Sequence, residues 1–324
     1  QKVGYWPYGY NSFHFDITKY LKAGQKNTLA VRLENLPESS RWYPGAGLYR
    51  NVHVIVTDDA YIPVWGTYVT TPSVNEKFAK VNIRTKVVLP EGADPAKYSV
   101  ETSVWNPNKQ KLTAVRTSLE QMKYNNDQAE QEFIIQSPSL WSPDMPALYS
   151  AETRLYEGDQ LKDIYTTPFG IRSIEIIPDK GFFLNGEHLK LKGVCRHQDR
   201  AERGNALYKM HHDEDAAIMA EMGTNAVRLA HYPKATYFYD LMDKYGIVTW
   251  AEIPQIGPGG YQDQGYINQP SFRENGKEQL KELIRQHYNH PSICFWGLFN
   301  ELKTIGDNPT EYIVERNELA HKED

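Results

Sequence analysis

The chain has 324 residues, 40% of them apolar, and this size allows two or three domains with sizeable cores. Its formal net charge is −5 with both signs interspersed, so it has no basic footprint for nucleic acid. No apolar run reaches the roughly 18 residues that a membrane-spanning helix needs. Nucleic acid and membrane are therefore set aside as partners.

Residues 1–58 have the pattern of β-structure. Leu29, Val31 and Leu33 alternate with small or charged neighbours, and the segment 52–56 alternates in the same way. Alternation with a period of two predicts half-buried strands of a sandwich. The turn-rich loop 39–47 lies between these strands, and nothing upstream offers the first strand a partner. We expect residues 1–58 to be the C-terminal part of a larger all-β domain.

Residues 59–172 are also expected to be β, with shorter strands and more frequent turns. Turn signals such as Glu91-Gly92 and 106–108 separate the alternating segments. Seven or so short strands in about 110 residues fit an immunoglobulin-like β-sandwich. The clearest strands are predicted at 81–85, 98–105, 132–136, 149–156 and 162–169.

In residues 173–324 the pattern changes to alternating strands and helices. Asn185-Gly186 predicts a tight hairpin turn. Gly246 is expected to end one amphipathic helix, and Ser271 with Glu274 predicts a capping box at the start of the next. Four near-continuous apolar runs are typical of parallel strands buried on both faces. These runs are 189–194, 225–230, 247–252 and 293–298.

Four strands are half of a TIM (β/α)8 barrel, which needs eight units and about 250 residues. The alternative is a complete open α/β sheet, which we disfavour because no Gly-rich dinucleotide or phosphate loop follows any strand. The charged segment 311–324 is expected to be an exposed helix. We expect a fragment, cut at both ends, that contains the first half of the barrel.

Cysteine and metal patterns point to no cofactor. Cys195 and Cys294 each lie in an apolar run and are expected to be buried free thiols. His211-His212-Asp213 contains ligand types, but it falls at an expected helix start, where the aspartate is better explained as a cap. No HExxH, CxxC or EF-hand spacing and no nucleophile elbow occurs. No cofactor is predicted, while a structural magnesium, calcium or sodium ion stays open.

The residues that can do chemistry follow the four predicted barrel strands. In parallel α/β folds the reactive groups lie at the carboxyl ends of strands. All four sets would therefore line one face of the barrel, and this convergence is a stronger signal than any one residue. The sets are 196–200, Arg228 with 231–233, Glu252, and Asn300-Glu301.

Each candidate has a structural alternative that the sequence leaves open. His197 could be a loop histidine with satisfied hydrogen bonds, and Asp199 could form a solvated pair with the arginine that follows it. Arg228 is better explained as a structural charge partner than as a substrate contact, and Glu252 could pair with a neighbouring arginine. On position alone, Glu301 fits a salt bridge as well as it fits catalysis.

Two long segments resemble the signatures of glycoside hydrolase family 2. The first begins Asn-Ala-Val-Arg-Leu-Ala-His-Tyr-Pro at Asn225 and continues to Trp250. The second runs from Tyr288 to Glu301 and reads Tyr-Asn-His-Pro-Ser-Ile-Cys-Phe-Trp-Gly-Leu-Phe-Asn-Glu. The segment 169–172 resembles the family's junction into its barrel. The succession of a jelly-roll sugar-binding domain (1–58), a sandwich (59–172) and a barrel half (173–324) is also similar to the family.

Within the family, the segment 192–199 is most similar to β-galactosidases. Glucuronidases typically carry a different segment there and Ala-Asn-Glu-Pro at the acid, where this chain has Phe-Asn-Glu-Leu. The resemblance implies a retaining exo-β-glycosidase that hydrolyses terminal β-galactosides. The alternatives are a β-glucuronidase, a β-mannosidase or a non-catalytic carbohydrate-binding fragment. The implied partner is a β-linked oligosaccharide or glycoconjugate. A homo-oligomer is possible, and the location in a bacterium is left open between periplasmic or secreted and cytoplasmic.

The resemblance also implies residue roles. Glu301 would be the general acid/base, Asn300 would hydrogen-bond the sugar 2-hydroxyl, and His197 and His231 would hold the galactosyl ring. Retaining enzymes place a nucleophilic carboxylate about 5–5.5 Å from the acid/base. We expect that nucleophile outside this chain.

Three further residues are substrate-binding candidates: Asp199, Glu252 and, from the loop of the first domain, Arg41. The loop around Arg41 lacks the acidic residue that the large β-galactosidases present to the sugar. Those enzymes can also hold magnesium with a Glu-x-His segment, where this chain has Pro-Gln-Ile-Gly-Pro-Gly-Gly at 254–260. We therefore predict no magnesium site there.

Overall fold

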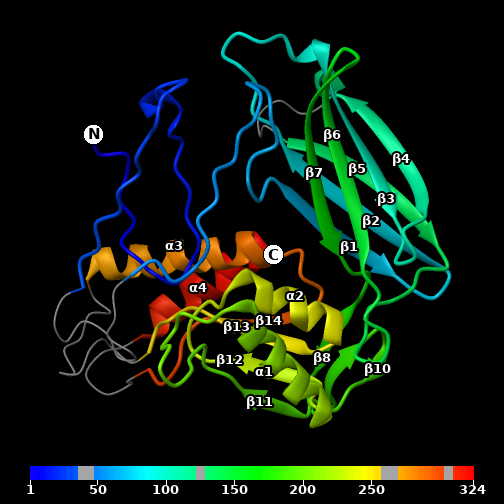
Figure 1. The fold of residues 1–324 in the computed structure, drawn as a ribbon. Helices are drawn as coiled ribbons and strands as arrows, with labels where there is room; N and C mark the ends of the chain where they lie inside the picture. The colour runs from blue at the N-terminus through cyan, green and yellow to red at the C-terminus, as the bar shows by residue number, and fades with distance from the viewer. Residues whose placement is uncertain (36–46, 122–127, 257–268, 303–308) are drawn as a thin grey trace.

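The computed structural model describes residues 1–35, 47–121, 128–256, 269–302 and 309–324. An irregular N-terminal segment lies over helix α3 (Pro270–His287), a β-sandwich stands to one side, and an α/β region forms the base (Figure 1). Among the described residues, no helix combines the length and apolar character needed to cross a bilayer. Arg41 lies outside the described residues.

The sandwich consists of two antiparallel sheets of three and four strands, in the orders β1-β2-β5 and β4-β3-β6-β7. Its core is built by the alternation seen in the sequence, because Val81, Ile83 and Phe133 from one sheet meet Val104 and Tyr149 from the other. The immunoglobulin-like sandwich is thus confirmed. The strands are β1 (Thr67–Val74), β2 (Phe78–Lys86), β3 (Tyr98–Trp105), β4 (Lys111–Ser118), β5 (Gln128–Gln136), β6 (Tyr149–Glu157) and β7 (Gln160–Phe169).

A small sheet of order β10-β9-β8 leads from the sandwich into the α/β region. It is formed by β8 (Ile174–Ile177), β9 (Gly181–Leu184) and β10 (Glu187–His188). Asn185 and Gly186 join β9 to β10 with positive φ angles of 54° and 82°, as a two-residue primed turn requires. The predicted hairpin is therefore present.

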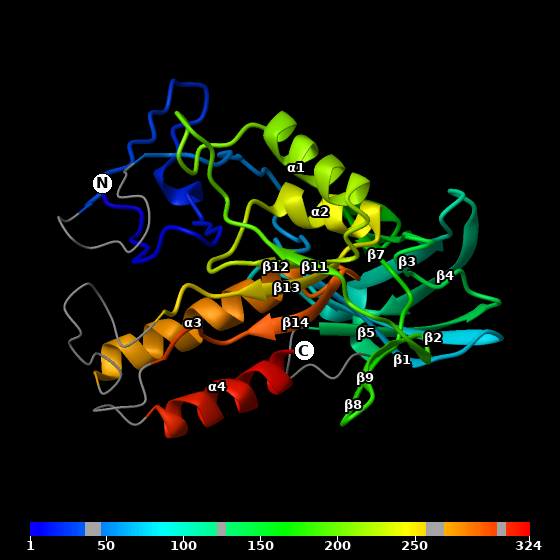
Figure 2. The same ribbon diagram turned by 90° about the horizontal axis from the view of Figure 1, so that it is seen from below.

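The α/β region is a parallel sheet of order β11-β12-β13-β14, as in the first half of a β/α barrel. A single core cluster joins the helices to one face of this sheet; α1 and α2 lie together at one end of it, and α3 and α4 at the other (Figure 2). The strands are β11 (Gly193–Cys195), β12 (Ala226–Leu229), β13 (Val248–Glu252) and β14 (Ile293–Gly297). The remaining helices are α1 (Lys209–Glu221), α2 (Thr236–Tyr245) and α4 (Thr310–Glu323).

The opposite face of the parallel sheet is open. Trp250 on β13 is 42% exposed, and it lines a hollow of about 220 Å³ together with Cys195, Arg228 and Phe295. The expectation of two buried thiols is therefore wrong for Cys195, which is exposed, while Cys294 is half-buried. The physical reason is that β11 presents Cys195 to this uncovered face.

The strands expected in residues 1–58 are not formed in the described parts of that segment, which contain only the 3-10 turn Thr18–Tyr20. The alternating apolar side chains are exposed there, up to 88% at Val56. A strand is stabilised by ladder hydrogen bonds to a neighbour and by a surface that covers its apolar face. Neither is present against residues 29–33 or 52–56 in the described structure.

Both predicted helix caps are wrong. Helix α3 begins at Pro270, whose fixed φ suits the first helical position, so Ser271 lies inside the helix and Glu274 instead pairs with Lys277 at 2.6 Å. Helix α1 begins at Lys209, so Asp213 lies in the helix and accepts a hydrogen bond from the Tyr237 hydroxyl. The helices begin two residues before the expected cap in α3 (N-cap Gln269) and five residues before it in α1 (N-cap Tyr208), so both expected caps lie inside a helix.

Helix α4 is not the exposed tail that its charges suggested. Tyr312 and Arg316 are buried against α3. Arg273 of α3 pairs with Glu311 and Glu315 of α4 at 3.2 and 2.5 Å. Amphipathic packing on α3 explains why a charged segment is ordered there.

The sandwich and the barrel half are joined by polar contacts of the segment 288–293. The Arg172 guanidinium donates to the carbonyls of Pro291 and Ile293 at 2.5 and 2.6 Å. The Asn289 amide bridges the backbone of β1, accepting from Val69 N–H and donating to the Thr67 carbonyl. This segment therefore fixes the start of β14 against the sandwich.

Candidate active site

The carboxyl ends of β12 and β13 bring three candidate residues onto one charged network. Glu252 ends β13 and is 1% exposed. One of its oxygens accepts from Arg228 Nε of β12, and the other lies 2.8 Å from His231 Nδ1. Burying a carboxylate is costly unless it is paired and hydrogen-bonded. The pairing with both partners is therefore what keeps Glu252 in this position.

Asn300 joins the same network from the segment after β14. Its Oδ1 accepts from Arg228 Nη2 at 2.9 Å. Its backbone N–H donates to the Gln255 carbonyl at 2.8 Å, and a parallel bridge pairs it with Ile256. Arg228 thus orients an amide side chain whose NH₂ group is a donor available to hydrogen-bond a hydroxyl.

Glu301 follows Asn300 directly, at the open end of the strand. Its φ is 50°, and its side chain is exposed. A positive φ turns the chain sharply after β14, since few non-glycine residues adopt this region. Glu301 is therefore a solvent-accessible carboxyl group placed one residue from the Arg228–Glu252 network.

His197 lies against His231, with ring centroids 5.4 Å apart in an edge-on arrangement. It also packs 5.6 Å from the Tyr232 ring. Burial lowers the pKa of His197, and the charges of Lys234 and His231 lower it further. The segments after β11 and β12 thus place two imidazoles side by side, as the strand-end rule predicts.

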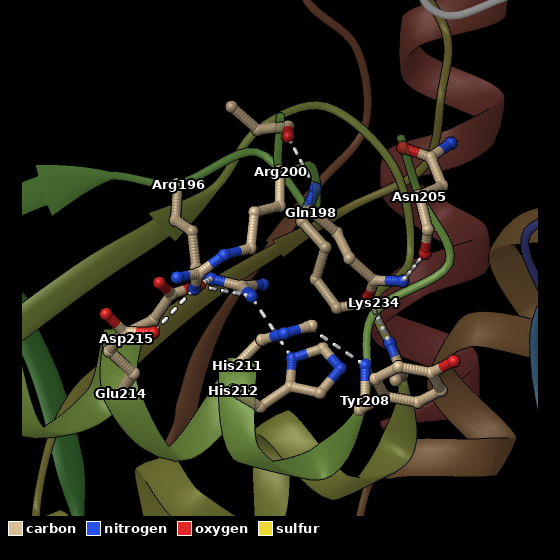
Figure 3. A network of polar contacts seen from close by, with 12 residues as sticks. Arg196, Gln198, Arg200, Asn205, Tyr208, His211, His212, Glu214, Asp215 and Lys234 are labelled. Carbon is tan, nitrogen blue, oxygen red and sulfur yellow. Dashed lines mark hydrogen bonds and ion pairs between the residues drawn. The ribbon is translucent and has the colours of Figure 1, made fainter. Parts of the chain in front are cut away.

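The remaining residues of the first strand-end set form a polar network with the start of α1 (Figure 3). The Arg196 guanidinium lies 2.7 Å from Asp215, 3.1 Å from His212 Nδ1 and over the Phe238 ring. Arg200 forms an exposed ion pair with Glu214 at 2.5 Å.

Gln198 ties this loop to the segment after β12. Its backbone N–H donates to the Tyr232 hydroxyl at 3.1 Å, and its side-chain carbonyl accepts from Ala235 N–H at 2.8 Å. Its amide donates to the Asn205 carbonyl. Two successive strand ends are therefore held together by one buried amide.

Three residues of this region were missed by the sequence reasoning. Lys234 is 1% exposed, and burial lowers its pKa well below the usual value. Its position directly after His231–Pro233 was a usable signal. Tyr10 stacks on Tyr232 at 4.6 Å, and Arg50 Nη2 donates to the Pro233 carbonyl at 2.8 Å. No local pattern marks these two, because they lie more than 180 residues away in the sequence.

The chemistry that this arrangement offers is proton transfer and hydroxyl recognition. An accessible carboxyl group, an oriented amide and two neighbouring imidazoles meet at the strand ends. Within the described ranges, no three of the histidine, cysteine, aspartate and glutamate side chains gather into a group that could hold a metal ion. The fold and the site define a class: a β/α-barrel protein with a carboxyl-bearing site at the carboxyl ends of its strands.

Comparison with known families identifies this class more closely. Residues 60–172 match the model described as "Glycosyl hydrolases family 2". Residues 175–318 match the model described as "Glycosyl hydrolases family 2, TIM barrel domain". The chain belongs to glycoside hydrolase family 2, and its second part is the beginning of that family's TIM barrel.

Curated relatives and solved structures are similar over nearly the whole chain. A β-glucuronidase of Bacteroides fragilis is 50% identical over 98% of this chain and 47% of its own length. The β-galactosidase BoGH2A of Bacteroides ovatus is 36% identical over 93% of this chain and 35% of its own. The structure of Bacteroides uniformis β-glucuronidase 2, covalently bound to cyclophellitol-6-carboxylate aziridine, has a TM-score of 0.80 at 30% identity and covers 96% of this chain and 39% of that one. The chain thus spans less than half the length of these relatives.

Proposed function

We propose that the protein containing this chain is a retaining exo-β-glycosidase in which Glu301 is the general acid/base. The observation that carries the proposal is the hydrogen bond from Arg228 to Asn300, which ties the residue preceding Glu301 to Glu252 and His231. Asn300 then meets the sugar 2-hydroxyl, and His197 and His231 hold the ring. Asp199, beside His197 at the same strand end, completes the proposed sugar-binding wall.

The second carboxylate is proposed to come from outside these residues. Glu252 is the other carboxylate in the network, but it is 1% exposed and both its oxygens are engaged by Arg228 and His231. A nucleophile must reach the anomeric carbon from about 5–5.5 Å away from the acid/base. Glu252 is therefore assigned to orienting Arg228 and His231, and a later barrel strand is proposed to supply the nucleophile.

The proposed glycone is β-linked glucuronic acid. The expectation from residues 192–199 was a galactoside, and the comparisons favour glucuronide over it. The relative at 50% identity is named a β-glucuronidase, and so is the B. uniformis protein of known structure. A β-galactosidase is the second candidate, supported by the 36% identity to the B. ovatus enzyme.

A panel of aryl β-glycosides tests both the activity and the glycone. The longer protein is assayed with nitrophenyl β-glucuronide, β-galactoside and β-mannoside under identical conditions. We expect kcat/KM to be at least about tenfold higher for the glucuronide, because a site that hydrogen-bonds a polar group rejects the analogue that lacks it. A preference for the galactoside selects the second candidate. Failure to hydrolyse any of the three contradicts the proposed function.

A further inference from the structure

The turn from Ala230 to Lys234 carries His231 into the candidate site, and two cations hold its backbone. The Lys234 ammonium donates to the Ala230 carbonyl at 2.5 Å. The Arg50 guanidinium donates to the Pro233 carbonyl at 2.8 Å and also to the Tyr10 carbonyl. The carbonyls of Ala230 and Pro233, at the two ends of the turn, therefore both accept hydrogen bonds from basic side chains.

The side chain in the middle of the turn is held as firmly. Tyr232 is 1% exposed and lies between two groups, the ring of Tyr10 at 4.6 Å and the ammonium of Lys234 at 3.4 Å from the ring centroid. Its hydroxyl accepts from the Gln198 N–H at 3.1 Å. Aromatic stacking and a contact between the amine and the ring face both favour this placement of the Tyr232 ring. The turn is thus fixed by residues from three distant parts of the sequence.

A buried ammonium is an unfavourable way to fill space. Taking a charge out of water costs several kcal/mol, and an apolar side chain of similar volume is often neutral or stabilising in its place. Lys234 nevertheless lies at 1% exposure beneath His231, with its hydrogen bond directed at the carbonyl that precedes that histidine. The presence of such a group at a strand-end site points to a requirement for position rather than for stability.

We propose that Lys234 and Arg50 are positioning residues that hold the 230–234 turn so that the His231 imidazole stays against Glu252 and faces the sugar. The inference rests on the proposed function. It assigns to the N-terminal segment a direct part in building the sugar-binding wall, through Arg50 and Tyr10. Misplacement of a positioned group by about 1 Å can cost on the order of 100-fold in rate.

The test compares Lys234→Met and Arg50→Met in the longer enzyme with Lys244→Met, a matched change at an exposed lysine of α2. kcat and KM are measured with the preferred aryl β-glycoside, and the dissociation constant is measured for a lactone analogue of the same sugar. We expect KM and the dissociation constant to rise about 10- to 100-fold in both site variants, kcat to fall less, and Lys244→Met to match the wild type.

A merely structural role would lower the folded fraction and hence kcat, leaving KM and the lactone affinity of the folded molecules unchanged; that pattern overturns the proposal. If Lys234→Met does not fold, Arg50→Met and Arg50→Gln carry the same test from the other side of the turn. Unchanged KM and lactone affinity in those folded variants would equally overturn it. Absence of glycosidase activity in the wild type would instead count against the proposed function.

Discussion

At the scale of single residues, the site depends on how a few buried charges are compensated. Glu252 is buried beside Arg228 and His231. Arg228 also donates a hydrogen bond to the side-chain oxygen of Asn300. A guanidinium suits this role because its planar donors can serve two acceptors in fixed directions. The catalytic candidate Glu301 stays exposed, so its position is set through its neighbour Asn300 and not through burial.

The His212 imidazole makes the stability of this region dependent on pH. Burial, together with the nearby Arg196 guanidinium, lowers the pKa of His212 to about 4. The unfolded chain, with a histidine pKa of about 6.5, therefore binds more protons between pH 6.5 and 4. The contribution of His212 to the unfolding free energy is fully present above pH 6.5. It is lost as the pH falls to about 4, and the loss is up to about 3 kcal/mol.

Urea unfolding between pH 4 and 7 checks this prediction. The wild type is compared with His212→Gln, which keeps a polar group but cannot titrate. We expect the unfolding free energy of the wild type to fall more steeply with acid than that of the variant, over the window from pH 6.5 to 4. Parallel curves for the two proteins would show that His212 does not contribute the predicted dependence.

At the scale of elements, what the sequence predicts well is decided by local periodicity. One face of α2 buries Phe238, Leu241 and Met242, although Tyr245 on the same pattern is 41% exposed, and the helix ends before Gly246, which is in the left-handed conformation, as expected. The four parallel strands also lie within about two to four residues of their predicted bounds, although β11 starts later than expected. Elements whose hydrophobic pattern is completed by their immediate neighbours are therefore predictable.

Elements and contacts that depend on distant partners are not predictable from the sequence pattern. The alternation at 29–33 is as regular as that in β2, but no neighbouring strand pairs with it in the described structure. Similarly, the strand-end rule brought Glu252, Asn300, His197 and His231 together correctly, whereas Arg50 and Tyr10 reach the site through tertiary contacts that no spacing encodes. Tertiary packing decides both cases.

Gly246, which follows the last residue of α2, should tolerate substitution poorly. Its φ is 67°, and an added Cβ would lie 2.6 Å from the Pro143 carbonyl oxygen. The left-handed conformation alone costs a non-glycine residue about 1–2 kcal/mol, and overpacking adds about 1–3 kcal/mol. Gly246→Ala should therefore lower the unfolding free energy by about 2–5 kcal/mol.

Gly223 provides the matched control, because its φ is 73° but an added Cβ would meet nothing within 4 Å. Gly223→Ala should lower the unfolding free energy only by the backbone cost of about 1–2 kcal/mol. Chemical denaturation of the two variants measures the difference. Equal losses in both would mean that the contact between α2 and residue 143 of the preceding loop does not constrain the chain.

At the scale of the whole molecule, the sandwich and the barrel half meet through the segment 288–293, which belongs to the second family-like signature. Its first residues face the sandwich, with Asn289 on β1 and Arg172 on the backbone at 291 and 293. The signature continues through β14 to Asn300 and Glu301. One continuous segment thus couples domain docking to the placement of the proposed acid/base.

Arg172→Met should loosen the start of β14. The substitution removes two hydrogen bonds from a charged donor, and each such bond stabilises the folded segment by about 1.5–3 kcal/mol. We expect amides of 291–295 to exchange with deuterium at least about 30-fold faster, corresponding to about 2 kcal/mol. Hydrogen exchange read by mass spectrometry measures this. The control is Arg154→Met, which removes a partly exposed ion pair with Glu152 and should change the exchange rates little. Unaltered exchange at 291–295 in Arg172→Met would refute the coupling between the sandwich and the start of β14.

The central claim concerns Glu301, and one measurement tests it most directly: kcat/KM of Glu301→Gln in the longer protein with a poorly activated aryl β-glycoside. Loss of the proton donor should reduce the rate about 10²- to 10⁴-fold, with the circular dichroism spectrum unchanged and with Glu221→Gln, at an exposed position on α1, fully active. A Glu301→Gln enzyme that turns over at the wild-type rate would contradict the assignment.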